Sequence, residues 1–100
     1  MEIVPSDKPN KRFVAILENG KKIYFGKPNA HTYIDGADET VRANYRKRHL
    51  ANKTEKKRID NLIPSAALLS YYLNWGDSRS LKKNAKSLSK RLGRSIKISS

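Results

Sequence analysis

The chain has 100 residues, of which 37% are hydrophobic, and 22 Lys and Arg against 9 Asp and Glu give it a net charge of +13. This length allows one small domain, and the apolar content is too high for a disordered basic tail. The absence of cysteine excludes disulfides, thiolate metal sites and cysteine nucleophiles. Because no apolar stretch is long enough for a bilayer and none follows Met1 as a leader, we expect no membrane span and no classical secretion signal.

The positive charge is concentrated in two segments. Residues 42–58 hold eight Lys and Arg and one acid, whereas residues 79–97 hold eight and no acid. The remaining residues carry six Lys and Arg against eight Asp and Glu. Self-repulsion of this size opposes folding unless an anionic partner compensates it. The charge pattern therefore predicts a polyanion or an acidic protein surface as a partner.

The two ends of the chain read as extended segments outside one central domain. Residues 1–10 contain Pro5 and Pro9 without periodic hydrophobicity, so we expect a mobile or peripheral extended arm. Residues 11–94 are expected to form a single domain. The tail, residues 95–100, alternates apolar and polar residues, which is compatible with a short edge strand.

A β-hairpin is predicted at the start of the domain. Two apolar runs flank Asn19-Gly20, a dipeptide that favours a two-residue type I′ turn. In that register Ile16 faces Ile23 and Val14 faces Phe25, so that these four residues share one face of the hairpin. Both faces are largely apolar, and we expect at least one of them to be covered.

Helical patterns follow the hairpin. The acidic pair Asp38-Glu39 stabilises the positive end of a helix dipole and predicts a helix over residues 39–50. Residues 53–58 continue the positive charge, and both a helix and a solvated linker fit them. A break at Pro64-Ser65 precedes the strongest candidate for a buried helix.

This buried helix is predicted over residues 65–75, with Gly76 in the left-handed position after its end. Residues 81–92 then place leucines and Ala85 on one stripe and lysines on the other sides, the pattern of an amphipathic helix. Together the patterns predict an α+β domain in which an N-terminal β-hairpin is followed by about three α-helices. Its core candidates are Phe13, Ile16, Ile23, Phe25, Leu69, Tyr72, Leu73, Leu81, Leu88 and Leu92.

The reactive residues do not form a catalytic constellation. His31 and His49 are the only imidazoles, and neither has the neighbours of a metal site. Asp35, Asp38 and Glu39 could hold a cation, but stabilisation of a helix start explains them more simply. No phosphate-binding glycine motif is present. We therefore expect no enzymatic activity, no cofactor and no metal.

The cationic segments are the candidate binding site, and two kinds of partner fit them. Lysine-rich helices bind phosphate backbones without sequence readout, and residues 65–93 could form a helix-turn-helix. The same charges could dock acidic surfaces of other proteins in an assembly. The candidate site residues are Arg42, Arg46, Lys47, Arg48, Lys53, Lys56, Lys57, Arg58, Lys82, Lys83, Lys86, Lys90, Arg91 and Arg94.

Three segments carry a family resemblance: GKKIYFG at residues 20–26, NYRKRH at residues 44–49 and LLSYYLNWG at residues 68–76. In combination they resemble a family of small basic proteins of large nucleocytoplasmic DNA viruses, of the mimivirus and chlorella-virus kind. The resemblance implies a viral protein and brings no catalytic residues with it.

For a viral protein of this kind we expect a non-enzymatic structural role. The leading hypothesis is a minor capsid or virion-associated protein that binds viral structural proteins such as a major capsid protein. The alternative is a protein that binds packaged viral DNA, or RNA, independently of sequence. Either role predicts a location in the virion, and in the host cytoplasm or nucleus during assembly. The sequence leaves the oligomeric state open.

Overall fold

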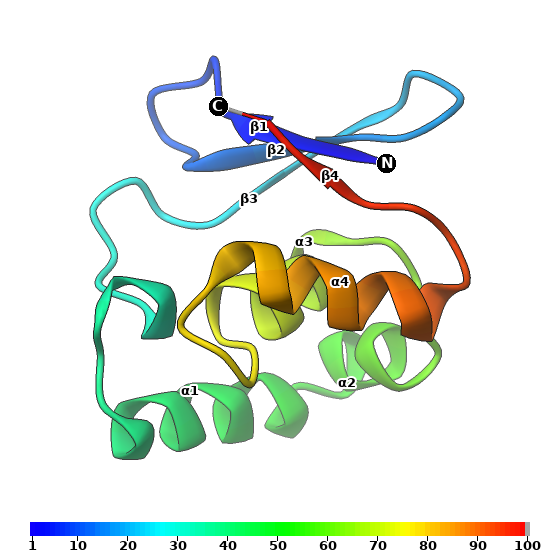
Figure 1. Cartoon of the computed structure of the whole chain (residues 1–100). Helices are drawn as coiled ribbons and strands as arrows, with labels where there is room; N and C mark the ends of the chain where they lie inside the picture. The colour runs from blue at the N-terminus through cyan, green and yellow to red at the C-terminus, as the bar shows by residue number, and fades with distance from the viewer. Residues whose placement is uncertain (100) are drawn as a thin grey trace.

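The structure is a computed structural model that describes residues 1–99. It has three layers, with a four-stranded sheet on one side and two layers of helices beneath it (Figure 1). The middle layer holds α3 (Ala66–Leu69), η2 (Ser70–Asn74) and α4 (Leu81–Leu92). The outer layer holds α1 (Glu39–Ala51) and α2 (Lys53–Asp60), and a short helical turn, η1 (Tyr33–Asp35), leads into it. The predicted α+β class is confirmed, and no helix in residues 1–99 is long and apolar enough to cross a bilayer.

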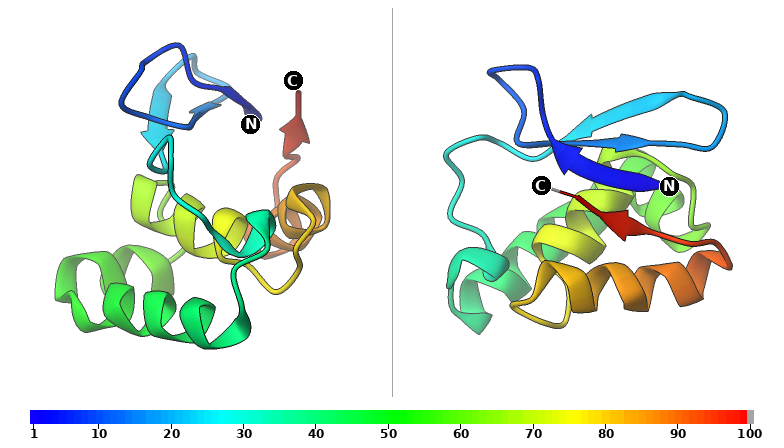
Figure 2. Two further views of the ribbon diagram at one scale, coloured as in Figure 1. Left: turned by 90° about the vertical axis from the view of Figure 1, so that its left-hand side faces the viewer. Right: turned by 45° about the horizontal axis from the view of Figure 1, so that its top comes forward.

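The sheet joins both ends of the described chain. Its strand order is β3 (Lys22–Phe25), β2 (Phe13–Ile16), β1 (Glu2–Pro5) and β4 (Lys97–Ile98). The first three strands pair antiparallel, whereas β4 lies parallel to β1 (Figure 2). The short edge strand suggested by the alternation in residues 95–100 is therefore present at Lys97–Ile98, and residue 100 lies outside the described residues.

The first residues are not the peripheral arm that we expected. β1 lies inside the sheet, and Ile3 is only 1% exposed. The amino group of Met1 donates to Glu18 Oε1 and to the backbone oxygen of Ser95, both at 3.0 Å. Pro5 did not prevent pairing because β4 pairs only with Glu2 and Ile3, so that β1 has a neighbour on one side alone at Pro5.

The hairpin register also differs from the predicted one. Phe13 pairs with Phe25 and Ala15 with Ile23, one residue away from the expected alignment. The connection is longer than the predicted two residues, since the N–H of Gly20 donates to Leu17 O and the N–H of Leu17 donates to Lys21 O. Gly20 takes the left-handed conformation, with φ of 85°. A three-residue loop of this kind shifts the register by one.

This shift exchanges the faces of β2. Ala15 is fully buried in the main core with Ile3 and Phe25, while Phe13 and Ile23 pack at its edge. Ile16 was predicted to be a core residue and lies on the opposite face instead, because a slip of one residue inverts a strand. The other nine predicted core residues are in this cluster or packed against it. A smaller cluster comprises Tyr33, Ala37 and Trp75, with Tyr45 packed on it.

The helix ends follow the sequence signals closely. Asp38, Ser65 and Ser80 cap α1, α3 and α4 by accepting hydrogen bonds from backbone N–H groups. Residues 53–60 form α2, which resolves the choice between helix and linker. The predicted helix over residues 65–75 is α-helical only in its first turn and continues as one turn of π-helix, η2.

Gly76 follows η2 for a different reason from the predicted one. It does not take the left-handed conformation, unlike Gly93 after α4, whose φ is 66°. A Cβ atom at Gly76 would collide with the backbone oxygen of Tyr72 and would lie 2.6 Å from Cγ of Asn84. The glycine therefore allows close packing of η2 against α4.

Candidate functional site

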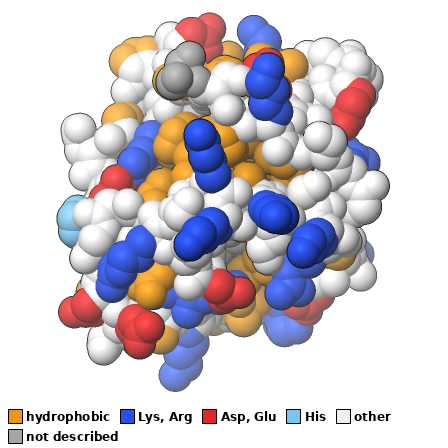
Figure 3. Space-filling model, viewed as in Figure 1, with side chains coloured by type: hydrophobic (Ala, Val, Ile, Leu, Met, Phe, Trp, Pro, Cys, Tyr) orange, Lys and Arg blue, Asp and Glu red, His pale blue; other side chains and the backbone are white. Residues whose placement is uncertain are grey.

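The lysines of α4 form an exposed cationic surface. The helix buries Asn84, Ala85 and Leu88, and Lys and Arg side chains gather over the face that it turns to the viewer (Figure 3). The predicted binding residues on this helix that are exposed are Lys82, Lys83, Lys86, Lys90 and Arg91. Segment 79–97 contains no acid, and none of the four lysines has a carboxylate within 4.0 Å among residues 1–99. Their charge is therefore available to a partner.

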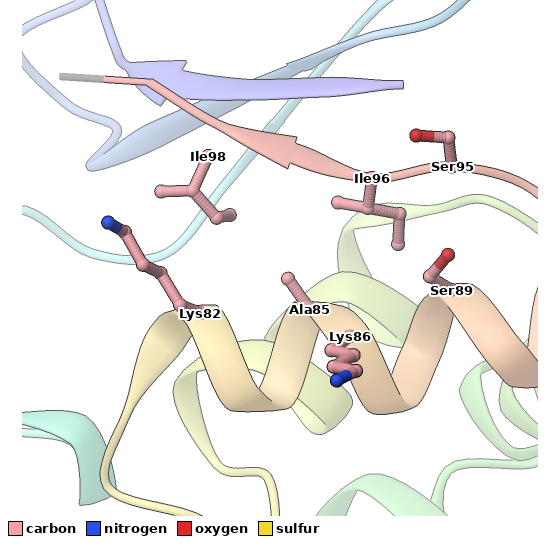
Figure 4. Close-up of a pocket in the computed structure, with 7 residues that line it drawn as sticks. All are labelled: Lys82, Ala85, Lys86, Ser89, Ser95, Ile96 and Ile98. Carbon is pink, nitrogen blue, oxygen red and sulfur yellow. The ribbon is translucent and has the colours of Figure 1, made fainter.

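A groove separates α4 from the edge strand β4. It has a volume of about 300 Å³ and is shown in Figure 4. Its apolar surface comes from Ala85 on the helix and from Ile96 and Ile98 on the strand side. Lys82 and Lys86 stand on the helical side. We call this feature the α4–β4 groove; its remaining lining residues are Ser89 and Ser95.

The first two arginines of α1 are used inside the protein. Arg42 donates through Nε to the backbone oxygen of Gly76 at 2.7 Å and through Nη2 to Asp77 Oδ1 at 2.6 Å. Arg46 also reaches Asp77, at 3.4 Å. Their side chains are only 20% and 18% exposed, respectively. Both residues were predicted to bind a partner, and the structure places them in the contact between α1 and the segment after η2.

Aromatic rings extend this contact toward α4. The guanidinium carbon of Arg46 lies 3.9 Å from the ring centre of Tyr71, and that of Arg91 lies 5.2 Å from the ring centre of Tyr72. The two tyrosine rings meet edge to face, with 5.0 Å between their centres. The two cationic segments therefore approach each other across η2, through stacked rather than repelling groups.

The remaining predicted residues are divided between α1, α2 and the tail. Lys56 pairs with Asp60 on the same helix, and Arg94 lies 3.7 Å from Glu18 in the hairpin. Arg48 is exposed, and its guanidinium carbon lies 5.8 Å from the ring centre of Tyr45. The others are exposed along α1 and α2: Lys47, Lys53, Lys57 and Arg58.

Asp35 and His49 make contacts inside the protein. Asp35 accepts two hydrogen bonds from the guanidinium of Arg12, both at 2.6 Å, and two more from Thr32. The bonds from Arg12 are the main reason why the pKa of Asp35 is well below its usual range. His49 Nδ1 lies 2.9 Å from Glu55 Oε2. Within residues 1–99 no group of three or more His, Asp and Glu residues is placed to hold a metal ion.

Sequence reasoning missed a second hollow on the molecule. A pocket of about 230 Å³ lies between the loop after β3 and the helices α1 and η2. Its lining includes Lys27, Asn74 and Trp75, none of which was a candidate. The only signal in the sequence was that all three family motifs contribute to it, through Gly26, Tyr45 and Ser70 among others.

Comparison with known proteins finds one viral relative and one family of unknown function. Residues 1–49 match the model of a family of unknown function, DUF5754. The chain is 41% identical over 80 residues to the uncharacterized protein L851 of Acanthamoeba polyphaga mimivirus, which covers 75% of this chain and 80% of that protein. No solved structure matches the chain significantly. These similarities agree with the viral resemblance of the three motifs.

Proposed function

We propose that this chain, which belongs to the same family as protein L851 of mimivirus and is a viral protein of a large DNA virus, is a non-enzymatic structural protein. In this proposal it is a minor capsid or virion-associated protein that docks an acidic surface of another viral structural protein, such as a major capsid protein. It acts in the virion and, during assembly, in the host cytoplasm or nucleus.

The observation that carries the proposal is the α4–β4 groove. Protein interfaces combine an apolar centre with a polar rim, and here Ile96 and Ile98 lie beside Lys82 and Lys86. A duplex phosphate backbone would use the lysines but would gain nothing from burying the isoleucines. An acidic protein segment with apolar side chains would use both.

The edge strand beside the groove offers a backbone contact. Lys97 and Ser99 donate their N–H groups to the backbone oxygens of Met1 and Ile3, respectively, at 2.9 Å. Since successive residues of a strand direct their backbone groups to opposite sides, Ile98 directs its own away from β1. A partner segment in extended conformation could pair there, as in other cases of strand addition. Lysines would speed the encounter and the apolar contacts would slow dissociation.

A second candidate function is binding of packaged nucleic acid. The observation that favours it is the lysine content of both α2 and α4, whose exposed members lack a sequence-reading arrangement but suit a phosphate backbone. Binding of this kind depends on the number of cations and weakens steeply with salt. It does not depend on which exposed lysines are removed.

Two double variants of equal charge separate the candidates. Lys82→Glu with Lys86→Glu changes the groove, and Lys53→Glu with Lys57→Glu changes α2 by the same total charge. If the groove docks a partner, only the first variant is lost from virus particles when both are expressed during infection. The nucleic-acid role would be favoured if both variants were lost from virus particles to the same extent. It would also require both variants to bind duplex DNA equally weakly at 50 mM and at 200 mM salt.

Particle fractionation provides the complementary measurement. Purified virions are separated into shell and DNA core, and the protein is quantified in each by mass spectrometry. The docking role predicts recovery with the shell. Recovery solely with the DNA core would contradict it.

A further inference from the structure

The second hollow has the features of a small-molecule site. It is bounded by the loop after β3, by α1 and by η2, and it shares no lining residue with the α4–β4 groove. Tyr45 and Trp75 form one wall, with their rings stacked at 4.2 Å between centres and 14° between planes. We call this feature the Asn74 pocket, after a lining residue whose side-chain oxygen has no hydrogen-bond partner among residues 1–99. Its other lining residues are Gly26, Lys27, Ala30, Thr32, Arg48 and Ser70.

Asn74 is a buried polar side chain with an unmade hydrogen bond. The residue is 1% exposed, and its Oδ1 atom has no hydrogen-bond partner among residues 1–99. A buried acceptor without a partner destabilises the folded protein, and such groups in native proteins call for an explanation. The terminal torsion of asparagine is broad and nearly two-fold, so a rotation can direct either end of the amide to a bound group.

The backbone around Asn74 is shaped to leave this amide beside the pocket. Gly26, with φ of 82°, faces it so closely that a Cβ atom would lie 2.9 Å from Asn74 Nδ2. On the other side η2 is a π-helical turn, in which the N–H of Trp75 donates to Ser70 O at 3.1 Å. Single π-helical turns are uncommon and occur frequently at functional sites. The turn places Ser70, Asn74 and Trp75 on the same pocket.

The pocket has cations beside its polar group. Lys27 and Arg48 line it and are both exposed. Two neighbouring hollows share Lys27 and Tyr45 with this pocket, and their lining also includes Lys11, His49 and Glu55. An occupant can therefore place a ring near Trp75 and Asn74 and an anionic group near Lys27 and Arg48.

We propose that the Asn74 pocket binds a nucleotide, with the base near the Asn74 amide and the phosphate near Lys27 and Arg48. A primary amide offers an acceptor and a donor side by side, which matches the hydrogen-bonding edges of nucleobases. Lysine and arginine are the usual phosphate ligands. The volume of 230 Å³ lies below the range of about 300 Å³ and above found for drug-sized ligands, and this limits the enclosed part to a single base.

The test uses Trp75, the only tryptophan of the chain, which is 5% exposed and lines the pocket. Its fluorescence is titrated with AMP, GMP, CMP and UMP, and calorimetry repeats the titration. Ribose 5-phosphate provides the anion without the base. We expect saturable binding of at least one monophosphate and binding at least about tenfold weaker for ribose 5-phosphate, equivalent to 1.4 kcal/mol.

Variants connect binding to the named residues. Asn74→Leu removes the amide at similar volume, and we expect nucleotide affinity to fall by at least about tenfold while the thermal midpoint stays equal or rises. Lys27→Ala and Arg48→Ala change exposed residues and should each weaken the monophosphate more than the corresponding nucleoside. Lys21→Ala in the hairpin loop removes the same charge outside the pocket and should change neither affinity.

The source of the nucleotide is resolved by a parallel titration with single-stranded trinucleotides. If Asn74→Leu weakens binding of the free monophosphate, the natural ligand is a soluble nucleotide. If Asn74→Leu weakens binding of the trinucleotide alone, the natural ligand is a nucleotide within a strand. The proposal is overturned if no probe binds, if Asn74→Leu binds as tightly as the wild type, or if Lys27→Ala and Lys21→Ala weaken binding equally.

Discussion

The two cationic segments hold eight Lys and Arg each, yet the structure uses them differently. In the first, Arg42 and Arg46 bridge α1 to Asp77 and lie against tyrosine rings with about a fifth of each side chain exposed. In the second, the lysines of α4 project into solvent with no carboxylate within ion-pair distance among residues 1–99. Arginines of both segments pack inside the protein, Arg42 and Arg46 in the first and Arg79 in the second, whereas the lysines of both segments stay open to solvent.

The difference follows from the chemistry of the two side chains. A guanidinium is planar, weakly hydrated and able to donate several hydrogen bonds while stacking on a ring. An ammonium is compact and strongly hydrated, so it keeps its charge in water while its stem covers apolar surface. Whether a basic residue is arginine or lysine therefore indicates more about its contacts in the folded protein than the net charge of its segment does.

The largest effect is expected from Arg42→Ala. This variant removes the bonds to Gly76 and Asp77 together with the contact on Tyr33, and we expect a loss of about 2 kcal/mol in the free energy of unfolding. Lys47→Ala, on the exposed side of the same helix, should change it by less than about 0.5 kcal/mol. Urea denaturation measures both, and equal losses would remove the distinction between the packed and the exposed cations.

A smaller effect on the free energy of unfolding is expected when the pH is lowered and Asp35 becomes protonated. Because its pKa is lower in the folded than in the unfolded protein, the stabilisation is present above about pH 4 and is lost as the pH falls further. In Asp35→Asn that part of the pH dependence should disappear, with a cost of about 1–2 kcal/mol at pH 7. Thermal midpoints of both proteins between pH 7 and pH 2 measure it, and parallel curves would contradict it. The segment that contains α4 has no acid and should not contribute.

The smallest effect is expected from Lys86→Gln, and it has the opposite sign. Lys86 is three or four residues from Lys82, Lys83 and Lys90 on α4, and like charges at these spacings destabilise a helix by about 0.2–0.5 kcal/mol a pair. The variant should therefore be slightly more stable at low salt, and 0.5 M NaCl should remove the gain. Lys21→Gln in the hairpin loop is the control. A destabilised Lys86→Gln would mean that this lysine packs as the arginines do.

The sequence predicted the features that depend on local chemistry. Capping residues and stripes of leucine placed α1, α4 and the start of α3, and all but one of the predicted core residues were correct. Asn19-Gly20 correctly marked a turn, but two-residue and three-residue loops both accept this dipeptide. The register depended on that choice, and so did the face occupied by Ile16.

The features that depend on distant partners were missed. Residues 2–5 have too short an apolar pattern to indicate a strand, and they form one because β2 and β4 lie on either side. The Asn74 pocket likewise joins segments from three parts of the chain. At the candidate site, the sequence shows which residues are cationic. It does not show that Arg42 and Arg46 form ion pairs with Asp77, which lies more than 30 residues later in the chain.

The parallel pairing of β1 with β4 also sets the order in which the chain can fold during synthesis. Glu2 aligns with Lys97 and Ile3 with Ile98. β1 is therefore synthesised first, but it can pair with β4 only after residues near the end of the described chain have been synthesised. Contacts of such long sequence separation slow folding because a large loop must close first. Before β4 pairs, β1 exposes unpaired backbone groups along that edge, and such an edge can pair with other chains.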